Sequence, residues 1–163
     1  MIAFIVAGAL TLTSPAFTND GNIPSKFTCD AGMQNPSPEL EWKDAPAGTK
    51  SFALIMHDPD APLANGFTHW VLFDIPATTT KLPEGFQAGS LGVSGNSGFR
   101  RAGYGGPCPP SGVHHYHFML SALDVPTLGL QAGATKADVE KAMQGHVIGT
   151  AETVGVYQRQ PKQ

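Results

Sequence analysis

The stretch that most constrains the fold of this chain is residues 103–118, GYGGPCPPSGVHHYHF. Its first half excludes regular structure, because three glycines and three prolines fall between Gly103 and Pro110. Its second half is rich in aromatic and apolar residues, and it predicts a β-strand that continues to residue 123. An irregular loop therefore runs directly into a strand.

Side chains alternate between the two faces of a β-strand. His114 and Tyr116 are therefore expected on one face of this strand, and His115 and His117 on the opposite face. The rigid loop then delivers a histidine and a tyrosine side by side to one surface, which suits a small polar pocket. We expect His117 to take no part in that pocket.

Two other segments carry acids and a histidine near strand ends. The continuous apolar run at 51–56 predicts a strand buried on both faces, and Asp58 and Asp60 follow where a proline stops it. His69 begins a second apolar run, which predicts a strand over 69–75. We expect these groups to converge with the histidine and tyrosine of the first stretch.

Three segments in these regions resemble the motifs of the phosphatidylethanolamine-binding protein family, in particular its bacterial and archaeal branch. They are DPDAP at 58–62, THW at 68–70 and GYGGPCPPSGVHHY at 103–116. Further similar segments extend the resemblance over nearly the whole chain. One departure is His115, where the family commonly has arginine, but this side chain is expected to point away from the pocket.

The resemblance implies a small cavity that binds phosphate-like or carboxylate anions. The positions that match the family site are Asp58, Asp60, Pro62, His69, Gly106, Pro109, His114 and Tyr116. Imidazole N–H groups, a phenol and free backbone N–H groups near Gly105 and Gly106 are suitable donors to anionic oxygens. Asp58 is expected to orient a histidine. Because a protonated imidazole attracts an anion, we expect binding to weaken as pH rises above the pKa of His69 and His114.

The function that the resemblance implies for these residues is a binding module for phosphate or a phospholipid headgroup of the phosphorylethanolamine type. Through that site it is expected to modulate a kinase or protease partner. One alternative is a small ester or phosphoester hydrolase that uses Asp58 and His69, although no G-x-S-x-G nucleophile motif is present. A second alternative is a protein-inhibitor surface that acts independently of the pocket. No enzymatic activity is predicted as the primary function.

No cofactor or metal site is predicted. His115 and His117 share a strand face and are candidate zinc ligands, but the chain contains neither a CxxC nor an HExxH motif. The net charge of −3 argues against a nucleic-acid partner, because proteins that bind nucleic acids usually carry a basic face. No stretch approaches the ~20 apolar residues of a membrane span.

The fold class predicted for these 163 residues is mainly β with some α, as one domain over 11–163. A central antiparallel sheet with a smaller packed sheet is what the resemblance implies. The strands expected from the pattern are 11–17, 26–28, 40–42, 51–56, 69–75, 114–123 and 150–157. A C-terminal helix is expected to begin after Thr135, with Asp138 at capping-box spacing, and to end at Gly145.

The glycine-rich segment at 83–102 predicts an irregular loop, and we interpret it as a wall of the site. Arg100 and Arg101 are its cations and the nearest ones to the pocket motifs in sequence. Their alternative role is that of solvated surface charges.

Two features bear on the compartment of the protein. Cys29 and Cys108 are the two cysteines, and we expect them to form a disulfide that holds the pocket loop; two buried thiols in a cytosolic protein are the alternative. Residues 1–10 are apolar and fit either the remnant of an export signal or an N-terminal extension, without the positive charge that begins a signal peptide. A disulfide favours a periplasmic or secreted location over the cytoplasm.

Overall fold

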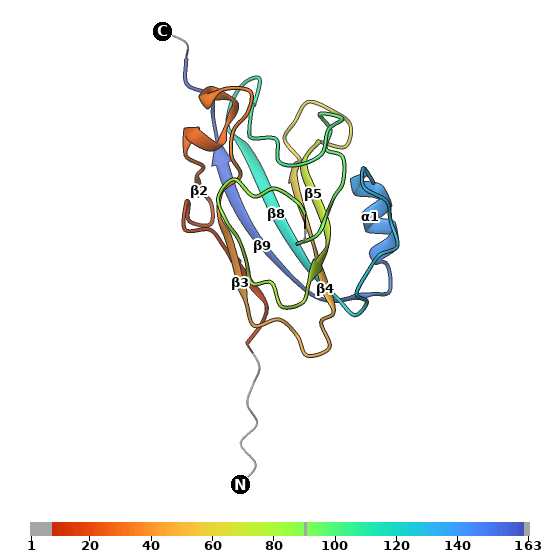
Figure 1. Cartoon of the computed structure of the whole chain (residues 1–163). Helices are drawn as coiled ribbons and strands as arrows, with labels where there is room; N and C mark the ends of the chain where they lie inside the picture. Colours follow the sequence, from red (N-terminus) through yellow and green to blue (C-terminus); the bar gives the residue numbers. More distant parts are fainter. Residues whose placement is uncertain (1–7, 90, 162–163) are drawn as a thin grey trace.

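A six-stranded sheet forms the centre of the computed structural model, which describes residues 8–89 and 91–161 (Figure 1). The strand order is β2-β9-β8-β4-β5-β7, and every pair is antiparallel except β2 with β9. The strands are β2 (Gly21–Asn22), β4 (Ser51–Asp58), β5 (Phe67–Pro76), β7 (Val93–Ser94), β8 (His114–Leu123) and β9 (Val147–Tyr157). The predicted central antiparallel sheet is confirmed.

A smaller antiparallel sheet packs on one face of the central sheet. Its strands are β1 (Thr11–Thr13), β3 (Leu40–Lys43) and β6 (Lys81–Leu82), in the order β1-β3-β6. Alternate side chains of these strands point inward and are buried. The inward Trp42 packs edge-to-face on Phe52 of β4, with ring centroids 5.5 Å apart, and so joins the two sheets. The indole Nε1 of Trp42 is buried without a hydrogen-bond partner among the described residues.

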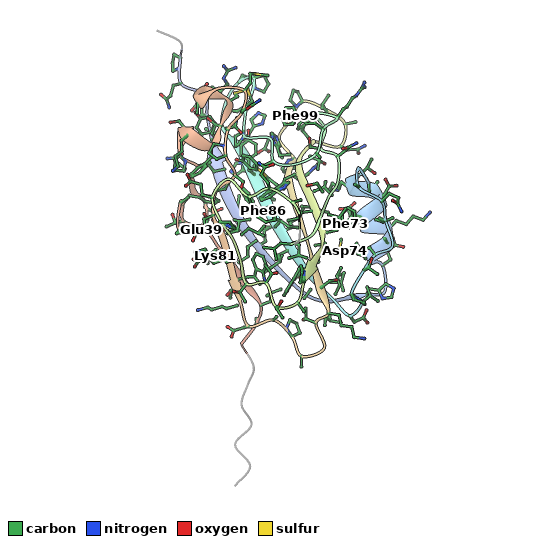
Figure 2. All side chains as sticks on the ribbon, viewed as in Figure 1. Glu39, Phe73, Asp74, Lys81, Phe86 and Phe99 are labelled. Atoms are coloured by element: carbon green, nitrogen blue, oxygen red, sulfur yellow. A yellow bond between two sulfur atoms is a disulfide. The ribbon has the colours of Figure 1, made fainter. Side chains whose placement is uncertain are left out.

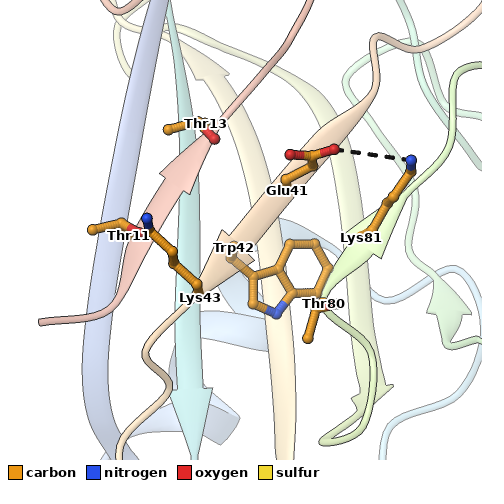
Figure 3. A pocket seen from close by; sticks show the side chains of 7 residues that line it. All are labelled: Thr11, Thr13, Glu41, Trp42, Lys43, Thr80 and Lys81. Carbon is orange, nitrogen blue, oxygen red and sulfur yellow. Dashed lines mark ion pairs between the residues drawn. The ribbon is translucent and has the colours of Figure 1, made fainter. Parts of the chain in front are cut away.

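The outer face of the small sheet is polar. Its side chains border a shallow surface cavity of about 340 Å³, drawn in Figure 3 with Thr11, Thr13, Glu41, Lys43, Thr80 and Lys81. Lys81 lies 2.9 Å from Glu39 and 3.9 Å from Glu41. Both acids are partly exposed, so these ion pairs contribute little to stability.

The opposite face of the central sheet is covered near β5 by the helix α1 (Lys136–Met143) (Figure 1). The predicted capping box is present, since Thr135 accepts from the Asp138 N–H and Asp138 accepts from the Thr135 N–H. Val139 and Met143 of the helix are buried against the sheet. Among the described residues, no helix is long and apolar enough to cross a membrane.

Strand β4 is buried on both faces, as its apolar run predicts. Leu54 and Met56 belong to the core between the sheets, whereas Ala53 and Ile55 belong to the core under the helix. Two layers therefore cover the two faces of one strand. This is why its sequence shows no alternation of polar and apolar residues.

Several predicted boundaries are wrong. The segment expected as a strand at 26–28 begins in the 3₁₀ helix η1 (Ser25–Phe27), because Pro24 opens a turn in which its carbonyl accepts from the Phe27 N–H. The first strand ends at Thr13 rather than residue 17, since the Ser14 hydroxyl turns back to the Glu39 carbonyl. A second 3₁₀ helix, η2 (Cys29–Ala31), follows η1.

Two further boundaries shift around the candidate site. Strand β4 continues to Asp58, and β5 begins at Phe67, so His69 lies inside its strand rather than at the start. The helix ends at Met143, two residues before Gly145, which has a positive φ. The expected N-terminal signal or extension falls largely on residues 1–7, outside the described residues; Leu10 is buried between the sheets.

Candidate functional site

The antiparallel pairing of β4 with β5 and β8 brings one end of each of these three strands to the same edge of the sheet. Asp58 at the end of β4 pairs with Phe67 at the start of β5, and His57 pairs with His117 near the start of β8. A cavity of about 280 Å³ opens there. It is lined by Asp58, Ala61, Pro62, Leu63, Phe67, His69, Phe99, Cys108, Pro109, Pro110, His114 and Tyr116.

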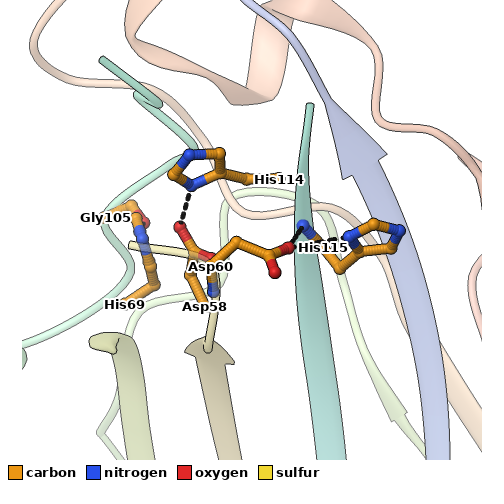
Figure 4. Close-up of polar contacts among 6 residues, drawn as sticks. All are labelled: Asp58, Asp60, His69, Gly105, His114 and His115. Carbon is orange, nitrogen blue, oxygen red and sulfur yellow. Dashed lines mark hydrogen bonds and ion pairs between the residues drawn. The ribbon is translucent and has the colours of Figure 1, made fainter. Parts of the chain in front are cut away.

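Asp58 and His114 form a buried pair in this cavity (Figure 4). The His114 Nδ1 lies 2.6 Å from the Asp58 Oδ2, and the other carboxylate oxygen accepts from the Asp60 N–H at 2.8 Å. Because an ionised carboxylate accepts and does not donate, the imidazole proton of this pair lies on Nδ1. The Nε2 atom of His114 is the ring nitrogen left for a ligand, and it donates when the ring is protonated.

His69 is held by the loop that precedes β8. Its Nδ1 donates to the Gly105 carbonyl at 2.7 Å, and the Gly105 N–H donates to the His69 carbonyl at 3.0 Å. Burial lowers the pKa of His69 to about 4, so the ring is neutral near neutral pH. With its proton on Nδ1, neutral His69 offers a lone pair on Nε2. Any loss of positive charge from His69 as pH rises therefore falls near pH 4 rather than near the ordinary histidine pKa of 6.5.

Tyr116 adds a buried hydroxyl to the same cavity. Its side chain is 0% exposed, and its ring packs edge-to-face on His69 with centroids 5.2 Å apart. Burial, and next the negative charge of Asp58, raises the pKa of the phenol, which keeps it protonated. The hydroxyl has no hydrogen-bond partner among the described residues. Tyr116 is thus a buried donor without an acceptor.

The remaining walls are apolar. Phe67 packs edge-to-face on both Phe99 and His69, with centroids 4.7 and 5.0 Å away. Gly98 and Gly105 permit this packing, because a Cβ at Gly98 would lie 2.6 Å from the Phe67 ring and one at Gly105 would overlap Phe99. Phe99 lies among the loops at one end of the molecule (Figure 2) and is 41% exposed at the mouth of the cavity.

A disulfide between Cys29 and Cys108 fixes the pocket loop to η2, as predicted. The two Cα atoms are 5.3 Å apart, and the Cys29 N–H also donates to the Pro107 carbonyl. Cys108 and the two prolines after it line the cavity. The bond therefore restrains the backbone that forms one side of the pocket.

Comparison with known proteins decides the family. The model of the phosphatidylethanolamine-binding protein family matches residues 13–158. The chain belongs to this family. A relative from Methanothermobacter thermautotrophicus, named UPF0098 protein, is 49% identical over 154 residues, covering 92% of this chain and 99% of the relative. The UPF0098 protein YbcL of Escherichia coli is 40% identical over 142 residues, covering 82% of this chain and 76% of YbcL.

Solved structures of phosphatidylethanolamine-binding proteins share the fold. The crystal structure of E. coli YbcL, described as a member of the mammalian family, superposes with a TM-score of 0.86 at 34% identity, covering 94% of this chain and all of that one. The homologue CT736 from Chlamydia trachomatis gives a TM-score of 0.85 at 38% identity, covering 93% and 99%. These similarities confirm the resemblance and the mainly β fold with its two sheets.

Most positions that match the family motif meet in one cavity. The matching residues that line it are Asp58, Pro62, His69, Pro109, His114 and Tyr116. Asp60 does not line it, because its Oδ2 accepts from the backbone N–H and the Nδ1 of His115 at 2.8 and 2.7 Å (Figure 4). Gly106 lines a neighbouring cavity instead.

The expectation of free backbone donors near Gly105 and Gly106 fails in this phosphatidylethanolamine-binding protein. The backbone N–H groups of Gly105 and Gly106 are not free, since they donate to the His69 carbonyl and to the Asn35 Oδ1. Arg100 and Arg101 do not line the cavity. Among the described residues that line this cavity, the side-chain donors for an anion are therefore His114 and Tyr116 of β8.

The strand alternation of β8 is confirmed. His115 and His117 lie on the face opposite His114 and Tyr116, and the His117 Nδ1 lies 3.2 Å from the Glu152 Oε1 on β9.

Within the described ranges, no group of three or more histidine, cysteine, aspartate or glutamate side chains is arranged to hold a metal ion.

Sequence reasoning missed the aromatic and aliphatic part of the pocket. Leu63, Phe67 and Phe99 line it, and none of them belongs to a motif that carries the family resemblance. A signal for Phe99 was available, because it lies in the glycine-rich loop at 83–102 that we interpreted as a wall of the site. Sequence alone did not show which side chain of that loop points inward.

Proposed function

We propose that this protein binds a small phosphate monoester, or inorganic phosphate, in the cavity between Asp58, His69, His114 and Tyr116. The observation that carries the proposal is the Tyr116 hydroxyl, a fully buried donor without an acceptor among the described residues. A buried unpaired hydroxyl is unfavourable by about 1–3 kcal/mol, and an anionic oxygen of a ligand relieves this.

The Asp58–His114 pair supplies the charge for this binding. A protonated His114 offers a donor at Nε2 and a positive charge, and its Nδ1 lies 2.6 Å from the Asp58 carboxylate. Asp58 itself faces the ring rather than the ligand, which explains how an acid is accommodated in an anion site. Tyr116 and His114 then donate to two oxygens of the same phosphate.

His69 sets a further requirement, because its Nε2 accepts rather than donates. A phosphate monoester monoanion carries one P–OH group, which donates to this nitrogen, and two or more oxygens that accept from His114 and Tyr116. A phosphodiester, such as the phosphate of a phospholipid, has the same charge and no hydroxyl. The geometry therefore favours a monoester over a diester headgroup.

Two contacts count against the hydrolase alternative. It requires Asp58 to activate His69, but Asp58 bonds to His114, and the His69 Nδ1 donates to the Gly105 carbonyl. The one cysteine that lines the cavity, Cys108, is held in a disulfide. The proposal includes modulation of a kinase or protease partner. Such a partner would contact the mouth of the ligand cavity, where the side chains of Leu63 and Phe99 are exposed, so a bound ligand would alter that contact.

Calorimetric titration with monomethyl phosphate and dimethyl phosphate tests the proposal. At about pH 5 both probes carry one negative charge, so their difference in affinity reports the P–OH group. We expect monomethyl phosphate to bind about three to ten times more tightly. His69→Asn retains a side-chain N–H for the Gly105 carbonyl and removes the Nε2 acceptor, and it should abolish that preference.

The matched control uses the two faces of β8. His114→Gln should weaken binding of monomethyl phosphate at least about tenfold, through loss of a charge-assisted hydrogen bond. His117→Gln makes the same chemical change on the opposite face and should leave affinity unchanged. Equal effects of the two substitutions would refute binding in this cavity.

A further inference from the structure

A second cavity of about 330 Å³ adjoins the pocket. It is lined by Cys29, Met33, Asn35, Phe99, Arg101, Gly106 and Cys108. Phe99 and Cys108 line both cavities, so a side chain and a disulfide form their common boundary. A ligand that occupied both cavities would therefore have to cross this boundary at Phe99 or at the disulfide.

The loop that carries Phe99 is a hairpin closed by backbone hydrogen bonds. The Ser97 N–H donates to the Arg101 carbonyl at 3.0 Å, and the Arg100 N–H donates back to the Ser97 carbonyl at 2.9 Å. The Gly98 N–H donates to the Thr68 carbonyl at 2.8 Å, which anchors the hairpin to β5 beside the pocket. The hairpin places Arg100 in its turn, with a φ of 58°.

Arg101 is held against the boundary between the cavities. Its guanidinium carbon lies 5.5 Å from the centroid of the Phe99 ring, a cation–π contact that positions the side chain. Within residues 8–89 and 91–161, Arg101 forms no ion pair with an acid. Among the residues that the structure describes, Arg101 is also the only arginine or lysine that lines either cavity.

The other polar groups around the second cavity already have partners. Asn35 accepts from the Gly106 N–H and donates to the Gly32 carbonyl, so its amide is satisfied. Asp30, next to Cys29 in sequence, accepts from the Tyr157 hydroxyl and from Arg159. The guanidinium of Arg101 is therefore the charged group available to a ligand in the second cavity, whose other lining includes the apolar side chains of Met33 and Phe99.

We propose that Arg101 anchors a second subsite, which binds a second acidic group on the same ligand. The inference rests on the proposed function, since the phosphate of that ligand occupies the pocket of His114 and Tyr116. The ligand class is a small phosphate monoester with a carboxylate or second phosphate at the far end of a short carbon chain. The chain crosses Phe99, and the exposed side chain of Met33 borders its path.

A homologous series of probes tests the subsite. Each ω-carboxyalkyl phosphate is compared by calorimetry with the alkyl phosphate of the same chain length, which lacks the carboxylate. We expect the carboxylate to tighten binding about three- to tenfold at one optimal chain length and not at the shortest, because an exposed arginine–carboxylate pair contributes modestly. The gain should shrink as ionic strength rises.

Two neighbouring arginines provide matched variants. Arg101→Gln should remove the gain from the carboxylate while the affinity for the plain alkyl phosphate stays unchanged. Arg101→Lys should retain part of the gain, since it keeps the charge and loses the planar fork. Arg100→Gln changes the net charge equally, one residue away, and should preserve the gain.

The outcomes separate the two proposals. Tight binding of alkyl phosphates with no gain from a carboxylate at any chain length would overturn the subsite and leave the phosphate pocket intact. An equal loss in the Arg100 and Arg101 variants would also overturn it, because the effect would then be nonspecific charge attraction. Failure of every phosphate probe to bind the wild-type protein would overturn the proposed function and the subsite together.

Discussion

Replacing Tyr116 by phenylalanine removes one oxygen atom that is fully buried and has no hydrogen-bond partner among the described residues. The ring itself stays, with its edge-to-face contact on His69 at 5.2 Å. If the hydroxyl serves a ligand, the unliganded protein should become more stable without it. The variant should also bind phosphate less tightly.

The magnitude follows from the burial of this group. A buried unsatisfied hydroxyl is unfavourable by about 1–3 kcal/mol, and at the lower end of this range Tyr116→Phe should stabilise the unliganded protein by about 1 kcal/mol. For a chain of this length, that gain raises Tm by about 2–4 °C. Loss of a hydrogen bond to an anionic oxygen lowers affinity by about 1.5–3 kcal/mol, which is at least about tenfold in Kd.

Tyr104→Phe is the matched control. The Tyr104 hydroxyl donates to the Phe27 carbonyl at 2.8 Å, so its removal leaves an acceptor unpaired and should destabilise the protein by about 1 kcal/mol. Thermal unfolding in phosphate-free buffer, followed by titration with monomethyl phosphate, measures both quantities. Destabilisation of the unliganded protein by Tyr116→Phe, as by Tyr104→Phe, would refute a ligand-binding role for this hydroxyl.

Two other predictions concern stability. Burial lowers the pKa of His69 from 6.5 to about 4, so the unfolded state takes up a proton before the folded state does as pH falls. The free energy of unfolding of the wild type should therefore drop by about 3 kcal/mol, relative to that of His69→Asn, between about pH 6.5 and 4. Urea unfolding of both proteins across this range measures it, and parallel curves would contradict the neutral buried state of His69. The disulfide links cysteines separated by 79 positions, so the double variant Cys29→Ser, Cys108→Ser should lose about 2–4 kcal/mol and bind monomethyl phosphate several-fold more weakly. An unchanged urea midpoint together with unchanged affinity would show that the bond restrains neither the fold nor the pocket.

Local patterns in the sequence were sufficient for several elements. The alternation of β8 put His114 and Tyr116 on one face and His117 on the other, because strand geometry has a period of two whatever surrounds it. The capping box at Thr135 was equally predictable, since both of its hydrogen bonds lie within one helical turn. Such features depend on neighbours in the chain.

The segment around Pro24 shows where local reading failed. Its residues have the composition of a short strand, yet Ser25–Phe27 is a 3₁₀ helix. The Cys29 N–H bonds to the Pro107 carbonyl, and the disulfide joins the same two segments. Contacts with a loop about eighty positions away in the chain thus accompany a local conformation that composition does not predict.

Sequence patterns indicate which chemical groups reach this edge of the sheet, whereas the folded arrangement of the strands sets how these groups pair. Asp58 and Asp60 have similar local surroundings in sequence, but the pairing of β4 with β8 places Asp58 against His114 and Asp60 against His115. The charge state of His69 likewise depends on burial, which the packing of Phe67, Phe99 and Tyr116 around it produces. Pairing and desolvation arise from contacts between distant segments, so no local pattern encodes them.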